Sequence, residues 1–228
     1  MSATASKPVV RSLLPARRVP RLATAAEILA VYAGILLYIW RWQYTHPYVW
    51  IALLAVVILS HFIHRDTLKE MGLTEHELRP CARLIFPLFI AVAIPAVIYG
   101  LWRRDWVLML PYAHAWLSFG GYAVWCSFQQ YLAQSYFHRR LKSMIETPHL
   151  SSLAVAIMFG GAHIPNPILM VATFAGGLVL AEVFARHPNI WPLAFVQAVA
   201  GFLIEGLSPA SLIHHMRVGP GYYFYHLR

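Results

Sequence analysis

The most constraining feature of this sequence is its succession of apolar runs that are close to the length of a membrane-crossing helix. A helix needs roughly 20 such residues to cross the hydrocarbon core of a bilayer. Inside that core every backbone N–H and C=O must be hydrogen-bonded within the protein, which favours helices. The composition agrees, since 59% of the residues are hydrophobic and 12% are charged, whereas a soluble domain carries about 25% charged residues. We therefore expect an all-α polytopic membrane protein.

Seven apolar runs are predicted to span the membrane. They define a transmembrane domain over residues 23–207, which follows a basic arm (1–22) and precedes an aromatic and basic interfacial tail (208–228). Proline, glycine, asparagine or charged residues separate most neighbouring runs, as expected for turns. The predicted spans are Ala25–Trp40, Tyr48–Ile63, Leu84–Trp102, Trp106–Phe137, Leu150–His163, Ile168–Phe184 and Ile190–Leu207.

The net charge of +9 has two possible explanations, nucleic-acid binding or membrane topology. The basic residues gather in the arm, in the polar loop His64–Arg83 and in the cluster His138–Lys142, at the ends of apolar runs. That distribution is typical of cytoplasmic topology signals and of contact with anionic lipid headgroups. We therefore expect a cytoplasmic N-terminus, anionic lipids as partners, and no nucleic acid.

Three amides stand within the fourth apolar run, at Gln129, Gln130 and Gln134. On a helix of 3.6 residues per turn they fall within about 140° of one another. Bare amides are costly in hydrocarbon, so we expect all three to face the protein interior or a wet cavity. Their predicted partners are His163 and Gln197, on later spans.

These polar residues occur in a motif order that resembles the CAAX protease and bacteriocin-processing (CPBP) family of intramembrane endopeptidases. That family carries Glu-Glu-x-x-x-Arg on one helix, Phe-x-x-x-His on the next, and His-x-x-x-Asn or Asp on a later one. Phe159 and His163 fit the second motif in full. Two further segments, Lys69–Leu73 and Gly177–Pro192, resemble the family's loop and turn sequences. The resemblance implies a CPBP-like helical bundle in a bacterial cytoplasmic membrane.

The first and third motifs are degenerate. Gln129 and Gln130 stand where the family has its paired glutamates, and Gln134 stands at the arginine. Gln197 replaces the second histidine, and Gly201 replaces the asparagine or aspartate. The resemblance therefore assigns His163, Gln129, Gln130 and Gln197 to the catalytic positions of the family.

These substitutions remove the proton acceptors from the site. In the family a glutamate and a histidine are thought to activate a water molecule, and an amide has no useful basicity. Losing a general base lowers the rate by about 10² to 10⁴. We therefore expect a catalytically silent member that acts as a binding or accessory subunit in the membrane. Its ligand would be another integral membrane protein, a lipid or a pigment-like hydrophobic molecule, with Gln134, Phe159, Gly201 and Glu182 contributing to binding. One histidine among amides is no transition-metal site, and we expect neither metal nor cofactor.

The alternative is an active endopeptidase with a divergent site. His163 would then act with Glu182 or Glu205, brought close by a shifted helix register. A carboxylate within hydrogen-bonding distance of His163 would favour that alternative, whereas contacts of Gln129 or Gln130 with His163 or Gln197 would favour the silent one. A transporter is disfavoured because the sequence has neither an internal repeat nor a row of charges along a path.

Overall fold

The computed structural model describes residues 19–103, 113–208 and 210–224, and every regular element within those ranges is helical. The predicted all-α fold class is confirmed. The helices are α1 (Arg21–Leu37), the π-helix η1 (Tyr38–Trp42), α2 (Gln43–Thr45), α3 (Val49–His64), α4 (Leu78–Arg103), α5 (Ala113–Gln130), the π-helix η2 (Tyr131–His138), α6 (Arg139–Met144), α7 (Pro148–Gly161), α8 (Pro167–Arg186), α9 (Ile190–Leu207), α10 (Ala210–Ile213), the 3₁₀ turn η3 (His214–Met216) and α11 (Pro220–Tyr223).

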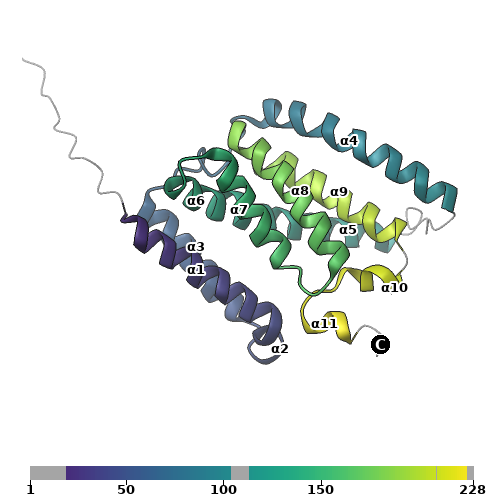
Figure 1. Cartoon of the computed structure of the whole chain (residues 1–228), viewed down its shortest axis with the longest axis horizontal. Coiled ribbons are helices and arrows are strands. Elements are labelled where there is room, and N and C mark those ends of the chain that lie inside the picture. Colours follow the sequence, from purple (N-terminus) through teal and green to yellow (C-terminus); the bar gives the residue numbers. More distant parts are fainter. Residues whose placement is uncertain (1–18, 104–112, 209, 225–228) are drawn as a thin grey trace, which may run out of the picture.

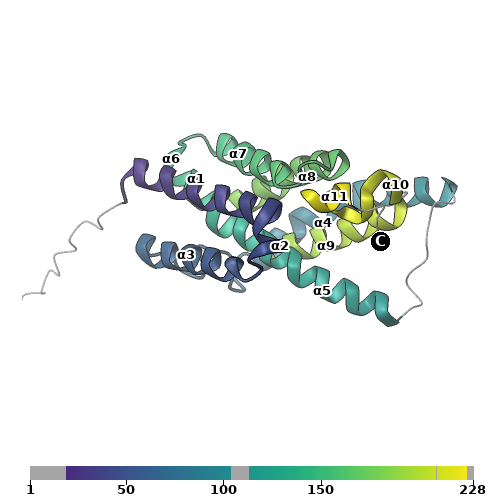
Figure 2. The same cartoon turned by 90° about the horizontal axis from the view of Figure 1, so that it is seen from below.

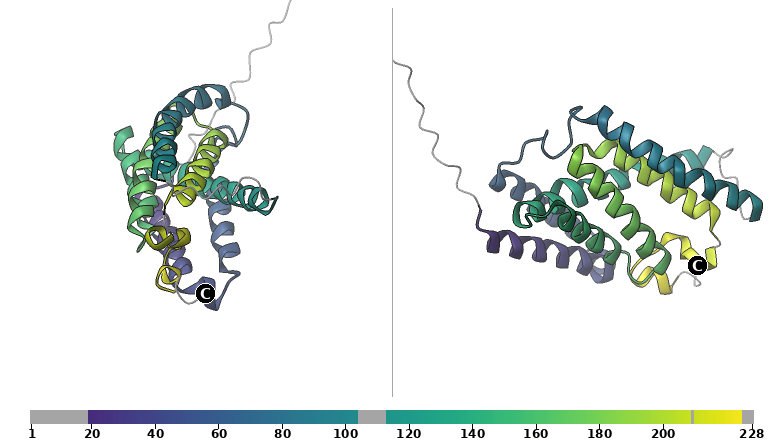
Figure 3. Two further views of the ribbon diagram at one scale, coloured as in Figure 1. Left: turned by 90° about the vertical axis from the view of Figure 1, so that its right-hand side faces the viewer. Right: turned by 45° about the horizontal axis from the view of Figure 1, so that its top comes forward.

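The helices form a bundle in which α9 is central. Helices α1 and α3 lie along one side, α4 lies along the other, and α7 to α9 run between them (Figure 1). Figure 2 and the left view of Figure 3 show α7 and α8 on one face of α9 and α5 on the opposite face. Helix α9 contacts α4 and α5 most extensively, and α7 packs against α8. Of the motif-bearing helices, α5 and α9 therefore pack against each other, whereas α7 packs against α8 and η2.

Four helical segments are long and apolar enough to cross a membrane: Arg21–Thr45, α4, α8 and α9. Helices α3 and α7 are shorter apolar helices. Because no membrane accompanies these helices, the number of seven spans and the cytoplasmic side of the N-terminus stay predictions. Most of the predicted arm (residues 1–18) lies outside the described residues, as do residues 104–112 within the fourth run.

Several helix ends differ from the sequence prediction. Helix α9 has the predicted limits, whereas α4 begins at Leu78 and so takes in the last part of the polar loop. The fourth run does not end at its basic cluster, because α5, η2 and α6 continue as one helix to Met144. The tail is helical in part, and Asn166 donates hydrogen bonds from Nδ2 to the carbonyls of Ile213 (2.8 Å) and Arg217 (3.2 Å).

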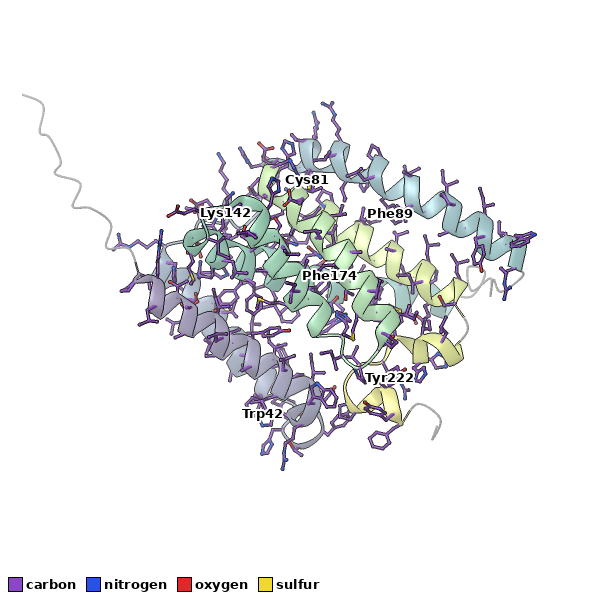
Figure 4. The ribbon with its side chains drawn as sticks, viewed as in Figure 1. Trp42, Cys81, Phe89, Lys142, Phe174 and Tyr222 are labelled. Atoms are coloured by element: carbon purple, nitrogen blue, oxygen red, sulfur yellow. The ribbon has the colours of Figure 1, made fainter. Side chains whose placement is uncertain are left out.

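The two ends of the bundle carry different side chains. Figure 4 shows Cys81 and Lys142 toward one end, which we call the basic end, and Trp42 and Tyr222 toward the opposite end, which we call the aromatic end. At the aromatic end the Gly219 N–H donates to the carbonyl of Ile164 (2.9 Å), so the tail is attached to the loop that follows α7.

A buried ionic cluster connects α1 and α3 with α6, which continues the motif-bearing helix α5 at the basic end of the bundle. The Arg140 side chain is 3% exposed, and its Nη2 lies 2.7 Å from Asp66 Oδ2. Arg140 also donates to Ser60 Oγ (2.9 Å) and to Glu27 Oε1 (3.4 Å). We call this set the Asp66 cluster; it comprises Glu27, Ser60, His61, Asp66, Arg139 and Arg140.

The Asp66 cluster predicts a specific dependence of stability on pH. Burial alone would raise the pKa of Asp66, but hydrogen bonds from His61, Arg140 and Arg139 outweigh burial and hold it far below its ordinary value of 3.8. The unfolded chain binds that proton first, so the stabilisation is complete above about pH 4 and is lost as the pH falls further. In detergent, the midpoint temperature of thermal unfolding should decrease as the pH is lowered below about 4. That part of the fall should be absent in Asp66→Asn, and an equal fall in the variant would contradict the assignment.

Asn189 joins the two segments whose sequences resembled family loops. Its Nδ2 donates to the carbonyls of Thr74 (2.8 Å) and His76 (2.9 Å), and its side chain is the N-cap of α9. The Ile190 N–H donates to the carbonyl of Gly72 (3.0 Å). Gly72 has φ +71°, and a Cβ there would lie 2.8 Å from the Phe184 ring. A glycine is therefore required at this close approach.

Candidate functional site

Three of the glutamines singled out in the sequence form one hydrogen-bonded chain between α5 and α9. Gln130 donates from Nε2 to Gln197 Oε1 (2.6 Å), and Gln197 donates from Nε2 to Gln129 Oε1 (2.5 Å). Gln130 is completely buried. The two helices are in extensive contact, so two positions of the first motif and one of the third meet as the sequence predicted. Their groups are neutral amides, which share protons in hydrogen bonds but do not accept one from water.

Gln134, at the position of the family's arginine, lies one helical turn further along. It is 1% exposed, and its Oε1 accepts a hydrogen bond from Nδ1 of His138 (3.1 Å). It lies within η2, the π-helix that begins directly after Gln130. π-Helical turns occur frequently at functional sites because they alter the direction of side chains on one helix face. The structure thus places Gln134 with a histidine rather than with the other glutamines.

His138 was missed as a site residue because its neighbours made it look like part of a basic cluster at a helix end. Its side chain is 1% exposed, and Nε2 lies 3.3 Å from Ser151 Oγ and 3.5 Å from Ser152 Oγ. Ser152 in turn bonds to Glu182. The only signal in the sequence was the i, i+4 spacing of Gln134 and His138, which places two side chains as neighbours on a helix.

His163 and Phe159, the intact second motif, contact each other at the end of α7. His163 Nδ1 donates to the carbonyl of Phe159 (2.7 Å), and the two rings pack edge to face with centroids 5.1 Å apart. Among the described residues His163 has no carboxylate as a hydrogen-bond partner. The imidazole is thus positioned by its own helix and lacks a charged group that would orient it as a base.

The two carboxylates considered for an active site lie elsewhere. Glu182 Oε1 is 3.0 Å from His149 Nδ1, and Oε2 is 3.2 Å from Arg186 Nη2, an i, i+4 pair on α8. Glu205 is exposed on α9. The shifted register that would bring either carboxylate to His163 does not occur in α8 or α9.

Gly201, which replaces the last residue of the third motif, packs against Tyr122. A Cβ at position 201 would overlap the Tyr122 hydroxyl and ring. The space that an asparagine or aspartate would require is therefore filled by an aromatic side chain from α5. Sequence reasoning did not find Tyr122, because a glycine alone does not show which residue takes the vacated volume.

Within the parts of the chain that the structure describes, no three or more histidine, cysteine, aspartate or glutamate side chains are grouped as metal ligands. The amide chain likewise offers neutral oxygens and nitrogens rather than the donors that zinc prefers. The chemistry available in this arrangement is hydrogen bonding.

Comparison with known proteins identifies the region that carries the motifs. A family model described as type II CAAX prenyl endopeptidase Rce1-like matches residues 116–203. This match confirms the resemblance to CPBP-type endopeptidases over the segment that carries the motifs. Together with the apolar helices, it also makes the chain an integral membrane protein. The CPBP-like segment includes every motif position from Gln129 to Gly201, whereas the Asp66 cluster reaches beyond it to α1 and α3. Comparisons with curated proteins and with solved structures give no match.

Proposed function

We propose that this CPBP-like membrane protein is catalytically silent and acts as a binding or accessory subunit in a bacterial cytoplasmic membrane. The observation that carries the proposal is the chain Gln129–Gln197–Gln130, in which amides bond to one another at positions where the family has acids and a histidine. An interhelical hydrogen bond of this kind contributes about 0.6 kcal/mol to membrane helix association. The hydrogen-bonded glutamines therefore stabilise the contact of α5 with α9, but they supply no base that could deprotonate a water molecule.

Two further observations support a silent site. His163 lies against the Phe159 carbonyl, so no acid in the described structure raises its basicity or fixes its ring. The Tyr122 side chain fills the volume beside Gly201, which a polar motif residue would otherwise occupy. Hydrolysis needs a base that deprotonates the attacking water, and neither the amides nor an acid beside His163 supplies one among the described residues.

The proposed partners are other integral membrane proteins and the anionic headgroups of lipids. Large apolar side chains are exposed along α4, including Ile94 (54%) and Ile98 (61%), and helix surfaces of this kind lie against lipid or against other helices. Arg79 and Arg83 are exposed at the basic end of the same helix, where they can reach phosphate groups. Co-purification in a mild detergent tests the first partner class, and binding to vesicles with and without phosphatidylglycerol tests the second.

Proteolysis is the direct test of the proposed function. Purified wild-type protein and His163→Ala should both leave quenched fluorescent peptides with transmembrane sequences uncleaved. The double substitution Gln129→Glu with Gln130→Glu restores two carboxylates at nearly unchanged volume. A general base typically raises the rate by about 10² to 10⁴. We expect the double variant to show an increase at the lower end of this range, on the order of 10² above background.

The matched control is Gln129→Leu with Gln130→Leu, which removes the amides without adding a base and should stay inactive. Cleavage by the wild type that His163→Ala abolishes would overturn the silent assignment and establish the divergent endopeptidase instead.

A further inference from the structure

Two buried polar atoms on neighbouring turns of the motif-bearing helix have no hydrogen-bond partner among the described residues. They are Gln130 Oε1 and Gln134 Nε2. Gln130 is 0% exposed and Gln134 is 1% exposed, so bulk solvent does not reach either atom. An unpaired buried polar atom is costly, and such atoms in native proteins are usually satisfied by an ordered water.

The two atoms are complementary in chemistry and belong to residues on neighbouring turns. One is an acceptor and the other is a donor, and their residues are four positions apart. Side chains with this spacing have Cβ atoms about 5–6 Å apart on a helix. A water molecule can form one hydrogen bond to each of two side chains that project from neighbouring turns in this way.

We infer that Gln130 and Gln134 together bind one water molecule inside the bundle. Water fits better than a ligand of fixed polarity because it donates and accepts. If the amide nitrogen and oxygen of the glutamines were exchanged, each residue would still present one unpaired atom, and water would satisfy that arrangement as well. Water is also the smallest molecule that both donates and accepts, which suits two side chains that are almost completely buried.

This water completes a polar connection that the protein side chains leave interrupted. On one side, Gln130 bonds to Gln197. On the other side, Gln134 bonds to His138, and His138 lies beside Ser151 and Ser152. With the water in place, hydrogen bonds run from the amide chain to the serines of α7, so the water links three helices.

The inference concerns the same glutamines as the proposed function but goes beyond it, because a bound water is expected whether or not the site is active. It also distinguishes the two motif glutamines. The oxygen of Gln129 is engaged by Gln197, whereas the oxygen of Gln130 faces the water. Of the two glutamate substitutions, Gln130→Glu is thus the one that places a carboxylate on a water already bound.

A double-mutant cycle tests the water without relying on catalysis. Thermal unfolding midpoints are measured in detergent for Gln130→Leu, Gln134→Leu and the double variant. If both residues hold one water, the first substitution already releases it, so the double variant should lower the midpoint by less than the sum of the two single shifts. The control pair is Gln130 and Asn166. Asn166 is also buried, but it donates to the carbonyls of Ile213 and Arg217, outside this polar connection, so the two shifts should add.

A high-resolution structure of the wild type supplies the second measurement, and it does not depend on how the variants fold. We expect density for one water within hydrogen-bonding distance of both glutamine side chains, and its loss in Gln130→Leu. Additive shifts in both cycles, or direct contact of the two glutamines without density between them, would overturn the inference. Neither result bears on whether the wild type cleaves peptides, so this inference and the proposed function fail separately.

Discussion

Arg140→Leu is expected to lower the free energy of unfolding by about 3–5 kcal/mol, because it removes one of the two arginines that pair with buried Asp66 and the only arginine that pairs with partly buried Glu27 in the described structure. Arg140 is 2% exposed and contacts Asp66 and Glu27. Asp66 would keep Arg139 (2.6 Å) as a partner, but Glu27 would keep only hydrogen bonds from Ser60, His64 and Tyr136. Leucine offers neither a positive charge nor hydrogen-bond donors to these carboxylates, so the folded state is destabilised relative to the unfolded state.

Chemical or thermal unfolding in detergent measures this loss. Arg186→Ala is the matched control, because Arg186 is 53% exposed and pairs with Glu182 on the same helix. An exposed pair of this type typically contributes less than about 1 kcal/mol. If the two variants lost similar stability, the Asp66 cluster would not be the structural centre described here.

Asn189→Ala is the substitution with the second largest expected effect, a loss of about 2–4 kcal/mol. It removes the N-cap of α9, which typically contributes about 1 kcal/mol. It also leaves the carbonyls of Thr74 and His76 without their donor; because Thr74 is half-buried and His76 is exposed, the two lost hydrogen bonds together should cost about 1–3 kcal/mol. Asn189 itself is completely buried, so water cannot take its place without rearrangement.

Asn189→Asp separates these two contributions. Aspartate keeps an oxygen that accepts from the Trp191 N–H but loses the amide donors to the loop. Its unfolding midpoint should lie below that of the wild type. A wild-type midpoint for Asn189→Asp would mean that the donors to Thr74 and His76 do not matter, and a wild-type midpoint for Asn189→Ala would contradict the cap as well.

The sequence predicted the apolar helices well because their length and hydrophobicity are local properties. The limits of α9 and nearly those of α3 followed from apolar runs bounded by turn residues. The start of α4 did not, because Leu78–Arg83 is too polar to be recognised as helix. Its first turns are held instead by Cys81, which is fully buried and donates from Sγ to the carbonyl of Asn189 (3.4 Å). That contact joins residues 108 positions apart.

The motif glutamines were predicted from spacing and resemblance, whereas the polar groups around them were not. Glu27 lies near the start of α1, where the sequence gives no sign of a partner, yet it receives hydrogen bonds from Ser60 and Tyr136. The basic residues at 138–142 were interpreted as a topology signal, yet Arg140 is an internal ion-pair partner. Side chains with long stems and charged heads look alike in a sequence whether they reach water or another helix, and only tertiary packing distinguishes the two.

The position of the Asp66 cluster limits how this protein can be dissected. Residues 116–203 contain every motif, which makes them an attractive fragment to express alone. That fragment would retain Arg139 and Arg140 but would discard Glu27, Ser60 and Asp66, so two guanidinium groups would face lipid or an empty helix surface. The fragment would therefore have to be co-expressed with residues 19–103, which supply Glu27, Ser60 and Asp66. Only then could its behaviour be attributed to the motifs.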